Sequence, residues 1–157
     1  MTAKSALKAE LVALLADALE VARAAHAAAV EGAISDDARP ENDKDTRGLE
    51  QSYLARGQAT RVAELETQLA ETTAMALRSF HASDAIGISA LVDADEGGRT
   101  LRYFVAPHGG GSVLAGGIQV VTLASPLGRA LLGKRIDDEV ELRLPGKLRS
   151  IVVVAIA

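Results

Sequence analysis

The chain has 157 residues, a formal net charge of −4 and no cysteine. The acidic balance argues against a protein that binds DNA directly through a basic face, and the lack of cysteine excludes a disulfide framework and a thiolate metal site. No apolar run is long enough to span a membrane, and the first residues lack the pattern of a signal peptide. We therefore expect a soluble, cytoplasmic protein with no membrane partner.

The first half of the chain predicts two long helices. Lys4 to Ala33 contains no proline and only one glycine, and its apolar residues recur at steps of four and three, which is typical of a heptad seam. The expected seam positions are Leu7, Leu11, Leu14, Ala18, Val21, Ala25 and Ala28. Thirty helical residues make a rod about 45 Å long.

A second helix is expected from Asp43 to about Phe80. Its seam positions are Val62, Leu65, Leu69, Thr72 and Ala76. The short polar link makes the two helices antiparallel neighbours, so residues 1–80 are expected to form an antiparallel coiled coil. On periodicity alone, a plain helical hairpin that dimerises or acts as a spacer is the alternative.

The link between these helices, ISDDARPENDKD (Ile34–Asp45), carries five carboxylates. Acids near a helix N-terminus stabilise the helix dipole, which accounts for Asp43 or Asp45. Asp36 and Asp37 instead follow the end of the first helix, where negative charge is unfavourable. They therefore point to a role other than helix stability.

After Phe80 the apolar period changes to two, which is typical of strands. The expected strands are 86–92, 99–106, 117–123, 139–144 and 151–156, with a turn at 93–98 and a loop at 107–112. Ser125 fits an N-cap, Pro126 the first helical position and Gly133 the residue just past a helix end. We expect an α+β protein in which residues 84–157 form a small antiparallel sheet with one short helix, after a boundary near 79–84.

Ser125–Ile156, SPLGRALLGKRIDDEVELRLPGKLRSIVVVAI, resembles the C-terminal end of the bacterial Gre (GreA/GreB) transcript-cleavage factors. The shared pattern is Ser-Pro, a short helix ending in Leu-x-Gly-Lys, an acidic turn, a strand, Pro-Gly and a last strand. Glu41–Gly57, ENDKDTRGLEQSYLARG, is similar to the start of the family's second helix. The length and the order of hairpin and sheet also fit, with residues 84–120 the least alike.

The resemblance implies an N-terminal antiparallel coiled coil and a C-terminal FKBP-like domain. It implies binding to RNA polymerase, with the C-terminal domain at the rim of the secondary channel and the acidic tip at the active site, near the transcript RNA 3′ end. There the tip helps to hold the second Mg²⁺, so that the polymerase hydrolyses a backtracked transcript. Two-metal hydrolysis needs both ions, and Mg²⁺ prefers oxygen ligands. On this reading the protein is no enzyme by itself, carries no cofactor of its own and binds no specific DNA.

The family's tip has an aspartate, two further residues and then a glutamate directly before an asparagine. Counting back from Asn42, Glu41 matches the glutamate, whereas Ala38 stands where the aspartate is expected and Asp37 lies one residue earlier. We assign the catalytic, Mg²⁺-holding role to Asp37 and Glu41. Because Pro40 stiffens the turn, a non-cleaving regulator of the secondary channel stays open beside a cleavage factor. A structural coiled-coil adaptor is the third hypothesis, and it would favour a leucine-rich seam without an acid cluster.

The resemblance also places the Ser125–Pro126 corner at the polymerase-docking surface. Arg129, on the same helix, would pair with an acidic partner, while a plain helix cap and a solvated arginine are the alternatives. PHGGGS, residues 107–112, lacks the Lys-Ser/Thr of a phosphate-binding loop and predicts a hairpin tip. The three histidines show no metal-ligand spacing, so we expect no independent active site.

Overall fold

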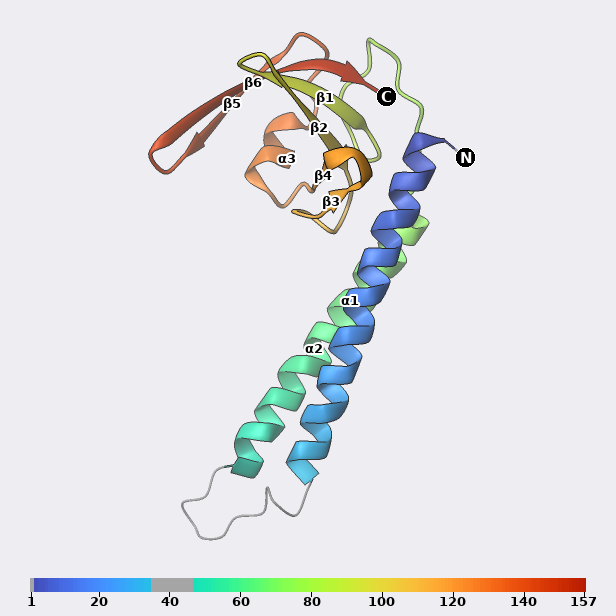
Figure 1. The fold of residues 1–157 in the computed structure, drawn as a ribbon, viewed down its shortest axis with the longest axis vertical. Helices are drawn as coiled ribbons and strands as arrows, with labels where there is room; N and C mark the ends of the chain where they lie inside the picture. The colour runs from blue at the N-terminus through green and yellow to red at the C-terminus, as the bar shows by residue number, and fades with distance from the viewer. Residues whose placement is uncertain (1, 35–46) are drawn as a thin grey trace. The chain divides into compact units, whose positions relative to one another are not determined.

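The structure, a computed structural model, describes residues 2–34 and 47–157. It contains two compact units, one formed by Met1–Val12 with Glu71–Ala157 and the other by Ala13–Ala70. The expected α+β class is confirmed, because a pair of long helices precedes a six-stranded sheet and a short helix (Figure 1). The domain boundary expected near residues 79–84 stays a prediction.

The two long helices are α1 (Ala3–Ile34) and α2 (Arg47–Ala74). α1 extends one residue beyond the expected range at each end. The expected start of the second helix at Asp43 lies outside the described residues, and its expected end at Phe80 is wrong, because α2 stops at Ala74.

The end of α2 is stabilised by the first turns of α1. Lys8 Nζ donates to the carbonyl of Met75 at 2.7 Å, and Lys4 Nζ donates to the carbonyl of Arg78. Both carbonyls lie just beyond the last residue of α2, so the two lysines hold the segment that follows α2 against the first turns of α1. Met75 is buried and Ala76 is exposed, so the seam expected to continue at Ala76 ends instead with the helix.

Within residues 13–70, α1 and α2 pack through a small apolar cluster. Leu19, Ala22 and Leu65 are buried in it. Ala18, Val62 and Leu69 pack at its margin, so the expected seam of α2 is confirmed here. Alanine contributes little apolar area at such a seam, and the hydrophobic stabilisation per residue is correspondingly small.

The seam of α1 differs from the expected heptad. Leu14 and Val21 are 41% and 71% exposed. The buried positions of α1 are Leu7, Leu11, Leu15, Leu19, Ala22 and Ala29. Leu11 and Ala22 are eleven residues apart, a spacing that returns to nearly the same face of a straight helix after three turns. In an alanine-rich helix more than one face is apolar in sequence. The packing of the folded protein therefore decides which face is buried.

The sheet has the strand order β3-β4-β2-β1-β6-β5. Its strands are β1 (Leu91–Glu96), β2 (Arg99–Val105), β3 (Val113–Leu114), β4 (Ile118–Val121), β5 (Glu139–Leu144) and β6 (Lys147–Ile156). Neighbours are antiparallel except β2 and β4, which run parallel. The expectation of a purely antiparallel sheet is therefore corrected. Because β3 runs back along the edge before β4 begins, β4 enters the sheet in the direction of β2.

The strand expected at residues 86–92 is mostly absent, and β1 instead begins at Leu91. Ile86 exchanges backbone hydrogen bonds with Lys134 and Gly133, at 2.8 and 2.9 Å, and Ser89 has a positive φ of 69°. β1 then continues through residues expected to form a turn. The turn itself is only Gly97–Gly98, both with positive φ, as a two-residue hairpin loop requires.

The core of the sheet domain lies between one face of the sheet and α3 (Pro126–Leu131), visible as the short helix beside the sheet in Figure 1. Its fully buried side chains include Tyr103, Val140, Ile151 and Leu131. The alternation expected for residues 139–144 is confirmed, because Val140 and Leu142 point inward and Glu139 and Glu141 outward. This packing fixes the position of α3, whose first turn carries the expected docking residues.

Candidate functional site

The acidic tip of the hairpin lies outside the described residues. Asp37 and Glu41, the expected catalytic and Mg²⁺-holding residues, belong to residues 35–46, and so do Ala38 and Pro40. Their roles stay predictions from sequence. The described parts of the expected site are the helices on either side of the tip and the corner at the start of α3.

Ser125 forms a helix cap at this corner, as the sequence predicts. Its backbone is extended, at φ −86° and ψ 151°, and its Oγ accepts a hydrogen bond from the Gly128 N–H at 3.0 Å. The same Oγ donates to the carbonyl of Thr122 at 2.9 Å. Pro126 occupies the first turn of the helix, where its missing N–H costs nothing. The corner is therefore rigid, and Pro126 is exposed on it.

Gly128 allows the chain to close this tightly. A Cβ at this position would lie 1.8 Å from the Thr122 carbonyl oxygen, far inside any allowed contact. The glycine is buried, so its role is close approach of backbone to backbone. Sequence reasoning from the Ser-Pro cap did not single it out, although a glycine inside a short helix is a signal of such an approach.

Arg129 lies on the exposed side of the same turn. Its Nη1 donates to the carbonyl of Ala124 at 2.7 Å, which holds the side chain against the helix start. Leu123 and Leu132, which flank the helix at its two ends, are 37% and 46% exposed. The structure thus gathers Ser125, Pro126 and Arg129 on one turn and adds exposed apolar side chains beside them, a composition that suits a protein contact.

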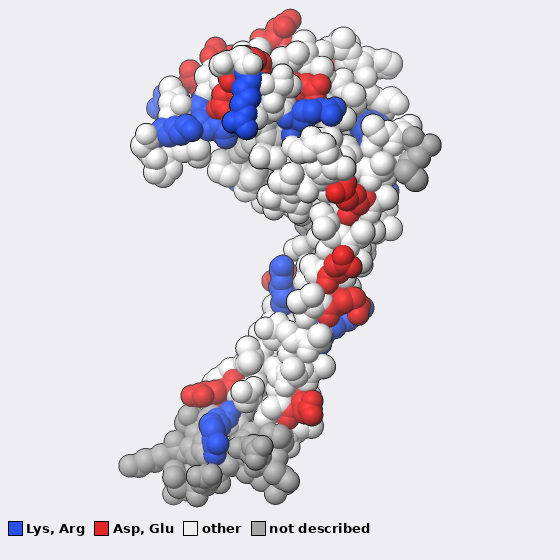
Figure 2. Space-filling model, viewed as in Figure 1, with Lys and Arg blue, Asp and Glu red and all other residues white. Residues whose placement is uncertain are grey.

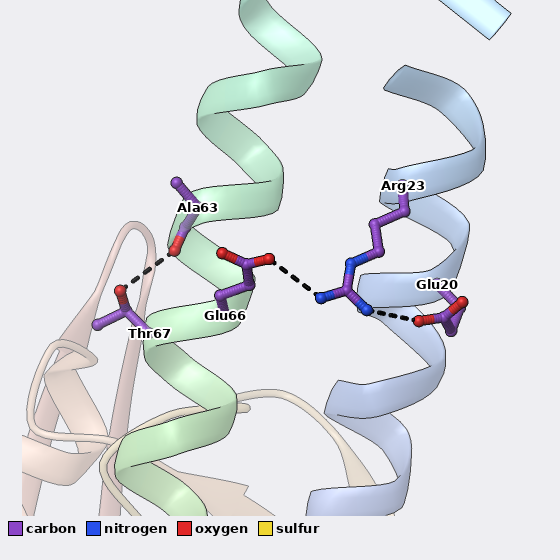
Figure 3. Close-up of polar contacts among 5 residues, drawn as sticks. All are labelled: Glu20, Arg23, Ala63, Glu66 and Thr67. Atoms are coloured by element: carbon purple, nitrogen blue, oxygen red, sulfur yellow. Dashed lines mark hydrogen bonds and ion pairs between the residues drawn. The ribbon is translucent and has the colours of Figure 1, made fainter. Parts of the chain in front are cut away.

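The two helices of the hairpin are joined by a polar contact on their surface (Figure 3). Arg23 of α1 donates to Glu66 of α2 at 3.0 Å and to Glu20 of its own helix at 2.8 Å. Hydrogen bonds to Glu66 and then Glu20 raise the pKa of Arg23 above its ordinary value. Because the pair is about half exposed, it contributes mainly to the register of the helices and little to their stability.

Basic residues of α2 also have partners on their own helix. Arg61 lies 3.7 Å from the carboxylate of Glu64, and the guanidinium of Arg56 lies 5.7 Å from the ring centre of Tyr53. In the part of the chain that the structure describes, no three His, Asp or Glu side chains gather as a metal site. No helix among these residues is long and apolar enough to cross a membrane.

A further polar network, which sequence reasoning missed, links β1 and β6. Arg149 donates from Nε to Glu96 at 2.7 Å and from Nη2 at 3.2 Å. Hydrogen bonding by Arg149 lowers the pKa of Glu96. Only the pairing of β1 with β6 brings these residues together, so no local sequence pattern reveals them.

A family model described as "Transcription elongation factor, GreA/GreB, C-term" matches residues 83–157. This range contains the Ser125 cap, Gly128 and the whole sheet. Residues 83–157 therefore match the GreA/GreB family. The resemblance seen in Ser125–Ile156 is thereby confirmed.

Curated GreA/GreB relatives extend the match beyond the sheet domain. Transcription elongation factor GreA of Sphingopyxis alaskensis is 29% identical over 141 residues, covering 90% of this chain and 78% of that protein. GreA of Syntrophotalea carbinolica is 49% identical over 37 residues, which cover 24% of this chain and 23% of that protein. Both relatives are named transcription elongation factor GreA.

Solved structures similar to this chain include GreA factor homolog 1 (Gfh1) of Thermus thermophilus, at 26% identity and a TM-score of 0.41, covering 93% of this chain and 94% of that one. Thermus aquaticus Gfh1 has 25% identity and a TM-score of 0.42, with 90% of each chain covered.

Proposed function

We propose that this protein binds RNA polymerase through the secondary channel and stimulates cleavage of backtracked transcripts. The observation that carries the proposal is a GreA/GreB C-terminal domain joined to a hairpin whose connecting segment holds five carboxylates. α1 has 32 residues and α2 has 28, so the two helices are about 48 and about 42 Å long. Such a rod is long enough to carry carboxylates from a surface to a buried centre.

In this proposal Asp37 and Glu41 supply oxygen ligands to a Mg²⁺ ion of the polymerase. That ion supplies Lewis acidity and a lowered pKa of bound water for hydrolysis of the phosphodiester bond. Carboxylates suit it because Mg²⁺ prefers hard oxygen ligands and usually keeps several waters. The chain itself positions the carboxylates near the RNA 3′ end, and the polymerase performs the hydrolysis.

A specific feature of the sequence favours a second candidate. Ala38 stands where the family pattern has an aspartate, and Pro40 restricts the backbone beside it. A tip with this register would still enter the channel, and it would regulate the polymerase without efficient cleavage. The two candidates share the docking step and differ in what the tip does.

The docking step is tested by affinity for core RNA polymerase. We propose that Arg129 and Pro126 lie in the contact, so Arg129→Glu should weaken binding by at least tenfold while leaving the thermal unfolding midpoint nearly unchanged. Arg143→Glu, a charge reversal at an exposed position of β5, is the matched control and should bind as the wild type does. Equal affinities of the two variants would remove the α3 corner from the interface.

Cleavage is tested separately with backtracked elongation complexes that carry labelled RNA. Shortened transcripts with the wild type support the first candidate. If the wild type produces none and yet blocks cleavage by an authentic GreA protein, the second candidate is correct.

A further inference from the structure

One edge of β2 is unpaired over its first half. β4 pairs with β2 only at Tyr103–Val105, whereas β2 begins at Arg99. A cavity of about 280 Å³ lies along this free stretch. Its lining residues are Arg99, Thr100, Leu101, Arg102, Tyr103, Gly116, Gly117 and Gln119.

The register shows which peptide groups face this cavity. Leu91 exchanges both of its backbone hydrogen bonds with Ala157, so the Leu91–Phe104 pair of β1 and β2 is a non-hydrogen-bonded pair. Such pairs alternate along an antiparallel ladder, and Arg102 and Thr100 therefore occupy the same kind of position opposite Asp93 and Asp95. Their N–H and C=O groups point away from β1, and the parallel pairing of Tyr103 with Gln119 already uses the C=O of Arg102. The N–H and C=O of Thr100 and the N–H of Arg102 are left at the free edge.

The charge at this edge is positive. The cavity lining contains two arginines and no carboxylate, in a chain with a net charge of −4. Because side chains alternate between faces along a strand, Arg99 and Arg102 lie on opposite faces of β2. Figure 2 shows that Lys and Arg side chains over the sheet domain lie beside Asp and Glu side chains.

Nearby carboxylates neutralise part of this charge. Asp93 pairs with Arg102 at 2.8 Å, Asp95 accepts a hydrogen bond from the Gly98 N–H, and Glu96 is engaged by Arg149. Arg99 and Lys147 also lower the pKa of Glu96, so this carboxylate faces several cations. Arg99 acts on Glu96 through its charge, and among the described residues it forms no direct ion pair.

We propose that the free edge of β2 binds an extended, acidic peptide segment of a partner protein by strand addition. The peptide would exchange main-chain hydrogen bonds with Thr100 and accept one from the Arg102 N–H, and its carboxylates would meet Arg99 and Arg102 on the two faces. Gly116 and Gly117 border the cavity, and a Cβ at either position would meet no atom within 4 Å, so the space beside these two glycines is open. This inference goes beyond the proposed function and does not depend on it.

The test uses the full chain and a fluorescein-labelled peptide, Val-Glu-Glu-Val-Glu-Glu-Val, followed by fluorescence anisotropy. We expect saturable binding that Arg99→Glu weakens by about tenfold, the size of one charge-assisted contact. Thr100→Pro removes the outward N–H without breaking the ladder to β1 and should also abolish most binding. Thr100→Ala keeps that N–H and is the matched control, expected to bind as the wild type does.

Several outcomes would overturn the inference. They include no saturable binding, equal binding of the Val-Lys-Lys-Val-Lys-Lys-Val peptide, equal affinities of Thr100→Pro and Thr100→Ala, and dimerisation of the chain through this edge. A single-stranded oligonucleotide that binds more tightly than the peptide would also overturn it, because the site would then recognise phosphate. Circular dichroism of Thr100→Pro confirms that the variant is folded before its affinity is compared.

Discussion

Glu96, at the end of β1, accepts two hydrogen bonds from Arg149 of β6, at 2.7 and 3.2 Å. The first effect of this pairing is to lower the pKa of Glu96, with smaller contributions from the charges of Arg149, Lys147 and Arg99. A carboxylate whose pKa is lowered by folding stabilises the native state above its ordinary pKa, and this stabilisation is lost as the pH falls through the lowered value. The pair therefore predicts a pH-dependent contribution to stability.

Glu96→Gln should lower the urea midpoint of unfolding at pH 7. The difference from the wild type should shrink as the pH falls from about 5 toward 3, because the wild-type carboxyl then becomes protonated as well. Urea titrations followed by circular dichroism at several pH values measure this. Glu141→Gln, at an exposed position of β5, is the control, and a Glu96→Gln difference that persists unchanged at pH 3 contradicts the prediction.

Thr72 is fully buried, and its Oγ1 has no hydrogen-bond partner among the described residues. Thr72→Val replaces the hydroxyl by a methyl group of similar shape and removes the cost of burying an unpaired polar atom. We expect a gain of about 1 kcal/mol in the free energy of unfolding, measured by urea denaturation. Thr72→Ser, which keeps the hydroxyl and loses the methyl group, should be less stable than the wild type, and a destabilised Thr72→Val would show that the hydroxyl has a partner.

Gly57 lies inside α2, and a Cβ there would meet nothing within 4 Å. Gly57→Ala should raise the free energy of unfolding by about 0.5–1 kcal/mol, because alanine has the better helix propensity and the smaller entropy loss on folding. Thermal and urea unfolding both measure the change. A loss of stability would mean that the hairpin needs a glycine at this point for another reason.

Gly128→Ala should have the opposite effect. Its Cβ would lie 1.8 Å from the Thr122 carbonyl oxygen, and a backbone atom cannot move aside as a flexible side chain can. We expect a loss of about 3 kcal/mol, with the largest hydrogen-exchange changes in α3. Near-wild-type stability would show that the corner has an alternative closed conformation.

Much of the sheet domain could be predicted because local signals agree there. Val140 and Leu142 alternate with charged residues, and β5 has the expected bounds. Ser125 and Pro126 similarly predict the start of α3, and the expected cap is present. Each of these signals depends only on neighbours in sequence.

The parts that were missed depend on distant residues. The apolar alternation at residues 86–92 suggested a strand, but Ile86 takes its backbone partners from Gly133 and Lys134. β3 has two residues, which are too few to show the alternation of apolar and polar residues that predicts a strand. In α1 the choice between Leu14 and Leu15 is made by packing, since both stripes of that helix are apolar.

The candidate site also combines residues that local sequence predicts with residues that only the fold brings together. The α3 corner was recognised from its cap, whereas Gly128 and the Arg149–Glu96 pair emerge only from the folded arrangement. Asp37 and Glu41 lie outside the described residues, and their roles rest on the family pattern.

The central claim is that Asp37 and Glu41 deliver carboxylates for transcript cleavage, and one assay tests it most directly. Backtracked elongation complexes with labelled RNA are incubated at fixed Mg²⁺ with the wild type, Asp37→Ala, Glu41→Ala and the control Asp17→Ala, an exposed acid of α1. The account predicts shortened transcripts with the wild type and Asp17→Ala, and a loss of at least a hundredfold in cleavage rate with both tip variants, about 2.7 kcal/mol of activation free energy. Cleavage that survives in Asp37→Ala and Glu41→Ala, or that is absent with the wild type, would contradict it.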